Sequence, residues 1–179
     1  MIIKKLTREE ITDALPLVFD VFCKYEAVNY PESGKKAFYN AIHSPEYLDM
    51  LTAYGAFCEE KLIGIIAARN GGKHIALFFV DGKHHRQGVG RSLFEEFLKE
   101  NENSRITVHS SQYAEEVYKK LGFVPEGKAR EDGGIIYIPM AFERRNPFPE
   151  AVSMTSSEIL RITMELTVKS AEYVAELNG

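Results

Sequence analysis

One stretch of the sequence, Phe79 to Arg91, restricts what this chain can fold into more than any other. An apolar strand leads into a basic turn after Val80, and a helix is expected to begin near Gly88. The first amides of a helix lack intrahelical partners, and the helix dipole favours negative charge there. Because two glycines let a ligand approach the backbone, the stretch predicts a phosphate or pyrophosphate site, with charge added by Arg86 and Arg91.

Two common phosphate-binding patterns do not fit this stretch. A dinucleotide-binding fold requires GxGxxG, but Leu93 stands at the position of the third glycine. A P-loop requires GxxxxGK followed by Ser or Thr, and this pattern is absent. A pair of glycines alone also fits a tight strand-to-helix turn that binds nothing, so both interpretations stay open at this point.

The order of the expected elements indicates an α/β fold with a central mixed sheet flanked by helices. A capping box at Thr7–Glu10 starts a helix that should reach about Tyr25 unless Pro16 divides it. We expect strands over 2–3, 56–59, 62–68, 75–80, 105–108, 123–128 and 135–140, and further helices over 35–42, from Ser44 to Gly55, after Gly88 and over 114–121. Gly55 is expected to end its helix.

The chain is expected to divide at the sequence NPFP, residues 146–149. Residues 1–146 would form the main domain, and residues 147–179 a helical extension opened by a second capping box at 155–158. The extension would serve docking or dimerisation, so a homodimer is one arrangement to expect, or it would simply cover the sheet.

Composition excludes several classes of protein. With 45% hydrophobic residues the chain can bury a core, and its net charge of −4 argues against a nucleic-acid partner. No apolar run approaches the roughly 20 residues that span a bilayer, and we expect no secretion signal at the N-terminus. The two cysteines, Cys23 and Cys58, form no metal or disulfide pattern, so a cytoplasmic protein is expected.

A second motif gives the glycine stretch a more specific meaning. Some twenty residues after it comes VHSSQYAEEVYKKLGF, residues 108–123. The two segments together resemble the GCN5-related N-acetyltransferase (GNAT) family, in which strand, R/Q-x-x-G-x-G/A and helix precede A-x-x-[hydrophobic]-Y-x-x-x-G-F. The order of elements from Ile2 to Met140 is also similar to that family. The resemblance implies an acyl-CoA N-acyltransferase fold, with a mostly antiparallel sheet, and acetyl-CoA as co-substrate.

The resemblance also implies which residues bind the acyl-CoA. His85 stands where the family usually has Arg or Gln, and Ser111 where it has Asn, so the match departs from the pattern at both positions. The backbone of Phe79 and Val80 would flank the pantetheine arm. The full set implied for the co-substrate is Phe79, Val80, His85, Arg86, Gln87, Gly88, Val89, Gly90, Arg91 and Ser111.

Acetyl transfer from a thioester to an amine requires a neutral amine and a stabilised leaving thiolate. Neutralising a lysine-like amine at pH 7 costs roughly 4 to 5 kcal/mol, so a general base or a water chain should help. Tyr118 stands at the family's general-acid position, and a phenol stays protonated at pH 7. A core tyrosine on an amphipathic helix would have the same spacing. For the base, Glu59, Glu60, His109, Asp81 and water remain alternatives.

The sequence gives little information about where the acceptor amine binds. Tyr25, Glu26 and Tyr30 would suit an amine cation, and equally an ordinary helical surface. His84 and His85, with His74, lack the further ligands of a metal site, so no metal is expected. Three functions follow: acetylation of a small-molecule amine, non-catalytic binding of acyl-CoA by a sensor module, and acetylation of a protein or peptide.

Overall fold

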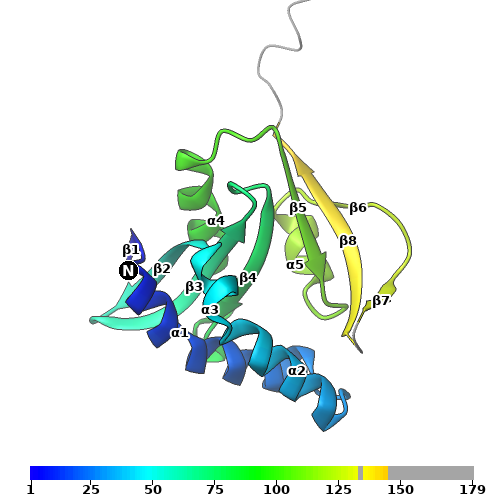
Figure 1. Ribbon diagram of the computed structural model, residues 1–179. Coiled ribbons are helices and arrows are strands. Elements are labelled where there is room, and N and C mark those ends of the chain that lie inside the picture. Colours follow the sequence, from blue (N-terminus) through cyan, green and yellow to red (C-terminus); the bar gives the residue numbers. More distant parts are fainter. Residues whose placement is uncertain (133–134, 145–179) are drawn as a thin grey trace, which may run out of the picture. The chain divides into compact units, whose positions relative to one another are not determined.

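An eight-stranded mixed sheet forms the centre of the molecule (Figure 1). The computed structural model describes residues 1–132 and 135–144. The strands are β1 Ile2–Lys5, β2 Thr52–Cys58, β3 Lys61–Arg69, β4 His74–Val80, β5 Arg105–Ser110, β6 Val124–Pro125, β7 Arg130–Asp132 and β8 Ile135–Glu143. Their order is β1-β2-β3-β4-β5-β8-β6, and β7 pairs with β8 beside this path. Within the described residues only the β4–β5 pair is parallel, which confirms the mixed, mostly antiparallel sheet.

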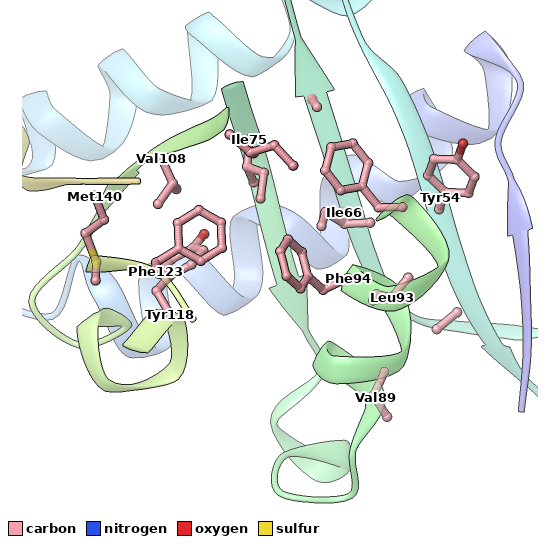
Figure 2. Packing of buried hydrophobic residues seen from close by; sticks show 14 of the residues in the cluster. Tyr54, Ile66, Ile75, Val89, Leu93, Phe94, Val108, Tyr118, Phe123 and Met140 are labelled. Atoms are coloured by element: carbon pink, nitrogen blue, oxygen red, sulfur yellow. The ribbon is translucent and has the colours of Figure 1, made fainter. Parts of the chain in front are cut away.

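Helices cover both faces of the sheet (Figure 1). One face packs on α1 Arg8–Val21, η1 Phe22–Glu26, α2 Glu32–Ile42 and α3 Pro45–Asp49, and the other on α4 Val89–Glu100 and α5 Glu115–Lys120. Residues alternate between these faces: Ile65 packs with the first group, and Ile66 with the second. Figure 2 shows the second core, where Phe94 and Tyr118 pack beneath the strands.

The first helix begins as its capping box predicts. The Thr7 hydroxyl accepts from the Glu10 amide at 3.3 Å, and the Glu10 carboxylate accepts from the Thr7 amide at 2.9 Å. The helix continues through Pro16 and loses only the hydrogen bond that this residue cannot donate. It then widens into the π-helix η1, in which the Ala27 amide bonds to the Phe22 carbonyl at 2.9 Å. Single π turns are frequently found at functional sites.

The expectation that Gly55 ends a helix was wrong. The helix begins at Ser44, which caps it, but α3 ends at Asp49, and Gly55 lies in the middle of β2. A Cβ atom at this position would lie 2.8 Å from side-chain atoms of both Leu6 and Leu62. The glycine is therefore explained by close packing within the sheet rather than by a helix end.

Turns differ from the expected boundaries by a residue or two. The β2–β3 turn is Glu59–Glu60, both with positive φ, rather than 60–61. The segment expected as one strand over 123–128 gives only the short β6, and β7 also pairs with β8. The helix expected over 155–177, and with it the proposed extension, lies outside the described residues.

The neighbouring strands β4 and β5 pair over a very short length. Their parallel register joins only His74 with Thr107 and Ile75 with Val108. Beyond Ile75, β4 stays paired with β3 as far as Val80, while β5 stays paired with β8 as far as Ser110. The two strands therefore separate toward their C-terminal ends, and the sheet has a gap there. No helix in the described part of the chain is long and apolar enough to cross a bilayer.

Candidate functional site

The loop after β4 is held in shape by its own polar groups. The Asp81 carboxylate accepts from the Lys83 amide at 3.0 Å, and Gln87 Nε2 donates to the Lys83 carbonyl at 2.9 Å. Arg86 and Gly88 both have positive φ, so the chain turns sharply before α4. Because no side chain caps the first turn of α4, its amides stay available to a ligand.

A cavity of about 590 Å³ lies against this loop, and we call it the loop cavity. Basic and polar groups from the loop and from α5 stand beside glycines and apolar residues in its wall. The lining residues are Glu26, Phe78, Val80, His84, His85, Arg86, Gly88, Val89, Gly90, Arg91, Tyr113, Ala114, Val117, Tyr118, Lys120 and Leu121. The uncapped helix start and the cationic side chains together suit an extended ligand that carries phosphate groups.

The gap in the sheet exposes backbone groups of β4 to this cavity. The Asp81 amide bonds to the Ile63 carbonyl, and hydrogen-bonded pairs alternate along an antiparallel register, so Phe79 faces β3. Phe78 and Val80 instead turn their backbone groups toward the gap. His85 Nε2 donates to the Val80 carbonyl at 2.8 Å. The resemblance named Phe79 and Val80 for the pantetheine arm, and the register turns the backbone groups of Phe78 and Val80, rather than those of Phe79, toward the gap.

A second, smaller cavity of about 210 Å³ lies on the other side of the gap, and we call it the sheet cavity. Aromatic rings and aliphatic side chains form most of its wall. The lining residues are Phe22, Glu26, Tyr30, Phe38, Ile75, Ala76, Phe78, Phe79, Val108, His109, Ser111, Ala114, Tyr118, Asp132, Ile135, Ile136 and Tyr137. Its wall is tied together by the Tyr30 hydroxyl, which accepts from the Ile136 amide and donates to the Ile136 carbonyl, both at 3.2 Å.

The loop cavity and the sheet cavity share four lining residues: Glu26, Phe78, Ala114 and Tyr118. Tyr118 is 6% exposed, and its ring packs between Phe78 and Phe123. Burial raises the pKa of its phenol, and the nearby Glu26 carboxylate raises it further. The phenol therefore stays protonated at neutral pH and remains a donor at the junction of the two cavities.

The carboxyl of Glu26 is also strongly altered by this environment. Burial raises the pKa of its carboxyl from 4.5 to about 7, and a hydrogen bond with the Ser111 side chain opposes this in part. Ser111 is itself fixed, since its hydroxyl accepts from the Ala114 amide at 3.2 Å. No basic side chain of the described residues forms an ion pair with Glu26.

The structure separates the three residues expected at the acceptor. Glu26 and Tyr30 line the sheet cavity, but Tyr25 turns toward the loop. Its ring lies against His85 at 4.9 Å and stacks on Tyr113 at 5.5 Å between centroids. A Cβ atom on Gly82 would lie only 1.9 Å from the Tyr25 hydroxyl, so a side chain there would displace the Tyr25 ring.

The carboxylates weighed as a base from the sequence line neither cavity. Glu59 and Glu60 form the β2–β3 turn, and the hydrogen bond from the Lys83 amide lowers the pKa of Asp81. His109 does line the sheet cavity, and burial lowers its pKa. Sequence reasoning gave Glu26 a different role, because neither its burial nor its proximity to Tyr118 is visible in local sequence.

The histidines considered for a metal are divided between the two ends of β4. His74 begins the strand and bonds to Thr107, whereas His84 and His85 follow its other end. Among residues 1–132 and 135–144, no three His, Cys, Asp or Glu side chains gather as metal ligands would.

Comparison with known proteins agrees with this architecture. The model of the acetyltransferase (GNAT) domain family matches residues 9–144. A GCN5-related N-acetyltransferase structure from Rhodopseudomonas palustris superposes with a TM-score of 0.68 at 17% identity, covering 79% of this chain and 94% of that one. PaiA N-acetyltransferase from Thermoplasma acidophilum, solved in complex with coenzyme A, gives 0.63 at 18% identity, covering 80% and 99%.

A third similar structure is an aminoglycoside 6′-N-acetyltransferase complexed with coenzyme A. It gives a TM-score of 0.57 at 18% identity and covers 84% of this chain and 100% of that one. At such identities the likeness concerns the fold. None of the curated protein sequences compared with this chain is significantly similar to it.

Proposed function

Because this chain belongs to the GNAT acetyltransferase family, we propose that it transfers an acetyl group from acetyl-CoA to a primary amine of a small molecule. The observation that carries this proposal is the meeting of two cavities at a buried phenol. The larger cavity has the uncapped helix start and cationic wall that a coenzyme A derivative needs. The smaller one is an aromatic site for the acceptor.

The residues that line the loop cavity fit acetyl-CoA. The amides of Val89, Gly90 and Arg91 would receive the pyrophosphate, and the cationic side chains of Arg86 and Arg91 would add charge. The resemblance also implies His85 and Gly88, which line this cavity, and Gln87 and Ser111, which do not. A Cβ atom on Gly88 would meet nothing within 4 Å, so the space beside the turn is open to a ligand.

Tyr118 supplies the acid for the leaving group in this proposal. The amine nitrogen attacks the thioester carbonyl carbon, the new C–N bond forms, and the C–S bond then breaks. The departing sulfur takes the phenolic proton of Tyr118, and a proton from the acetylated nitrogen restores the phenol. The described residues offer no cysteine among the cavity linings, so direct transfer between the two substrates is the route that this site supports.

The size of the sheet cavity favours a small acceptor. Pockets for drug-sized ligands usually measure roughly 300–1,000 Å³, and this one measures about 210 Å³. The link between Tyr30 and Ile136 ties η1 and the loop after it to β8 across its wall. A peptide would need an extended groove for residues on either side of its amine.

We place this activity in the cytoplasm, since Cys23 and Cys58 are both unpaired thiols on different elements. Assembly into a homodimer remains part of the proposal and can be read from light scattering. Neither feature is needed for the chemistry at the junction of the two cavities.

Calorimetric titration with acetyl-CoA, NAD and ATP tests the proposal most directly, followed by acetylation assays with amines and peptides. We expect selective binding of acetyl-CoA and release of free coenzyme A only when a small amine is present. Binding without turnover on any acceptor would indicate a sensor of acyl-CoA. Turnover on peptides alone would contradict the small-molecule acceptor, and no binding by folded protein would contradict the proposal as a whole.

A further inference from the structure

The charge distribution around the sheet cavity is one-sided. Two carboxylates, Glu26 and Asp132, line it, and no Lys or Arg does so among the described residues. The one imidazole in its wall, His109, has its pKa lowered by burial first and by the nearby Arg69 and Arg130 next, so it is neutral at pH 7. A ligand carboxylate would therefore enter a site that offers it no cationic side chain to pair with, at a high desolvation cost.

The rest of the cavity wall suits a ligand that carries an apolar part beside a cationic group. Phe22 and Phe38 stack with ring centroids 3.9 Å apart, and Tyr137 stacks on His109 at 4.0 Å. Aromatic faces attract ammonium groups and also bury apolar chains or rings. The small volume leaves little room for a second polar group on the ligand.

Glu26 lies beside the position that an amine would have to occupy for the reaction. It lines both cavities together with Tyr118, so its carboxylate is beside the route between acceptor and thioester. It ends η1, where the π turn places it at the gap in the sheet. The groups facing it are Ser111, which bonds to it, and the phenols of Tyr118 and Tyr30, whose pKa values are raised by burial first and then by the charge of Glu26.

We propose that the sheet cavity binds a small amine with an apolar or aromatic body and no carboxylate, and that Glu26 binds its ammonium group and accepts the proton released before attack. This inference rests on the proposed function, and it specifies both the acceptor and the general base. In the step, the N–H bond of the ammonium breaks, and the proton passes to the Glu26 carboxylate. The freed nitrogen pair then attacks the thioester.

Matched acceptors test the first half of the proposal. Phenylethylamine and phenylalanine share a body and differ by the carboxylate, as do tyramine and tyrosine. We expect kcat/KM to be at least about 100-fold higher for each amine than for its amino acid, because an unpaired carboxylate would have to be desolvated. Equal or better use of the amino acids would overturn the acceptor class, and so would acetyl-CoA binding without acetylation of any carboxylate-free amine.

Glu26→Gln tests the second half, because glutamine keeps the size of the side chain but cannot accept the proton. We expect kcat/KM for phenylethylamine to fall by about 100-fold or more, with unchanged acetyl-CoA affinity. Glu102→Gln, which removes the same charge from an exposed residue outside both cavities, should leave the rate unchanged. A phenylethylamine fluorinated next to the amine, so that the amine is largely neutral at pH 7, needs no base. It should therefore recover most of the activity that Glu26→Gln loses.

The pH profile separates a base from a merely structural residue. With Glu26 as base, kcat/KM of the wild type should rise through about pH 7 and then stay level up to the pKa of the amine. In Glu26→Gln only free amine reacts, so the rate should keep rising tenfold per pH unit toward about pH 10. A level profile in the variant would overturn the assignment. If the folded wild-type protein does not bind acetyl-CoA at all, the proposed function itself is wrong.

Discussion

Glu26 and Tyr118 come from opposite faces of the sheet and line the same two cavities at the gap between β4 and β5. The carboxylate acts on the phenol, since burial raises the pKa of Tyr118 and the charge of Glu26 raises it further. A proton acceptor and a proton donor therefore lie at one junction, 92 positions apart in the sequence. In the reaction that we propose, the pair would supply both of the proton transfers that amide formation requires.

Tyr118→Phe should remove turnover while acetyl-CoA still binds. Phenylalanine keeps the packing against Phe78 and Phe123 but has no proton to give, so kcat should fall by about 100-fold or more. Coenzyme A release and calorimetric titration measure the two quantities. Tyr54→Phe is the matched control, because this phenol donates to Glu100 at 2.7 Å away from both cavities. Equal turnover by Tyr118→Phe and the wild type would rule out the acid role.

Gly90→Trp should abolish acetyl-CoA binding and leave the fold intact. Gly90 lies in the first turn of α4, and a Cβ atom there would make ordinary contact with Phe78 at 3.6 Å. A tryptophan would therefore extend into the loop cavity without straining the backbone. Calorimetry gives the affinity, and circular dichroism shows whether the variant is folded. A folded variant that binds acetyl-CoA normally would place the co-substrate elsewhere.

His85→Ala should weaken acetyl-CoA binding by about tenfold. The imidazole holds the loop to the Val80 carbonyl at 2.8 Å, and without it the loop must be ordered when the ligand binds. His84→Ala is the comparison, because the His84 imidazole also lines the loop cavity but forms no side-chain hydrogen bond with residues 1–132 or 135–144. Similar affinities for both variants would show that the contact with Val80 does not organise the site.

Glu26→Gln should stabilise the protein at alkaline pH. The carboxyl titrates at about 7 in the folded protein and near 4.5 when unfolded, so the native state binds more protons between these values. The free energy of unfolding of the wild type therefore falls as pH rises from about 4.5 to 7. The variant should gain up to about 3 kcal/mol at pH 8 and nothing at pH 4. Urea unfolding at the two pH values measures the difference.

His74 should make the protein sensitive to acid. Burial, and then the charge of Arg69, lower the pKa of its imidazole to about 4, below the unfolded value of 6.5. The unfolded chain then binds more protons, so stability is lost as pH falls from 6.5 toward 4. His74→Gln should reduce this loss by about 1 to 2 kcal/mol, because partial exposure to solvent screens the effect. An unchanged acid transition would show that another group controls it.

Local patterns in the sequence predict much of this fold. The capping box at Thr7 and the strand-to-helix turn at Gly88 depend on neighbours in the chain, and both are confirmed. Gly55 was misplaced because its reason is a close approach of Leu6 and Leu62, which no local pattern records. Pro16 did not divide α1, since packing of the helix on the sheet outweighs one missing hydrogen bond.

The candidate site was only partly predictable for the same physical reason. The glycine stretch and Tyr118 belong to motifs with fixed spacing, so sequence alone could single them out. The altered pKa of Glu26 arises from desolvation by residues distant in the chain. Whether Phe78 or Phe79 turns its backbone groups toward the gap depends on the register with β3, which a sequence without its partner strand does not specify.

The gap between β4 and β5 has a consequence for the resistance of the protein to proteolysis. Only two residue pairs join these neighbouring strands, and they lie beside the place where the co-substrate is proposed to bind. A ligand that fills the gap binds the folded chain and not the unfolded one, and a hundredfold excess over Kd would add about 2.7 kcal/mol. Proteases that act on opened molecules should therefore cleave the protein more slowly when acetyl-CoA is present, and limited proteolysis with and without acetyl-CoA measures the difference.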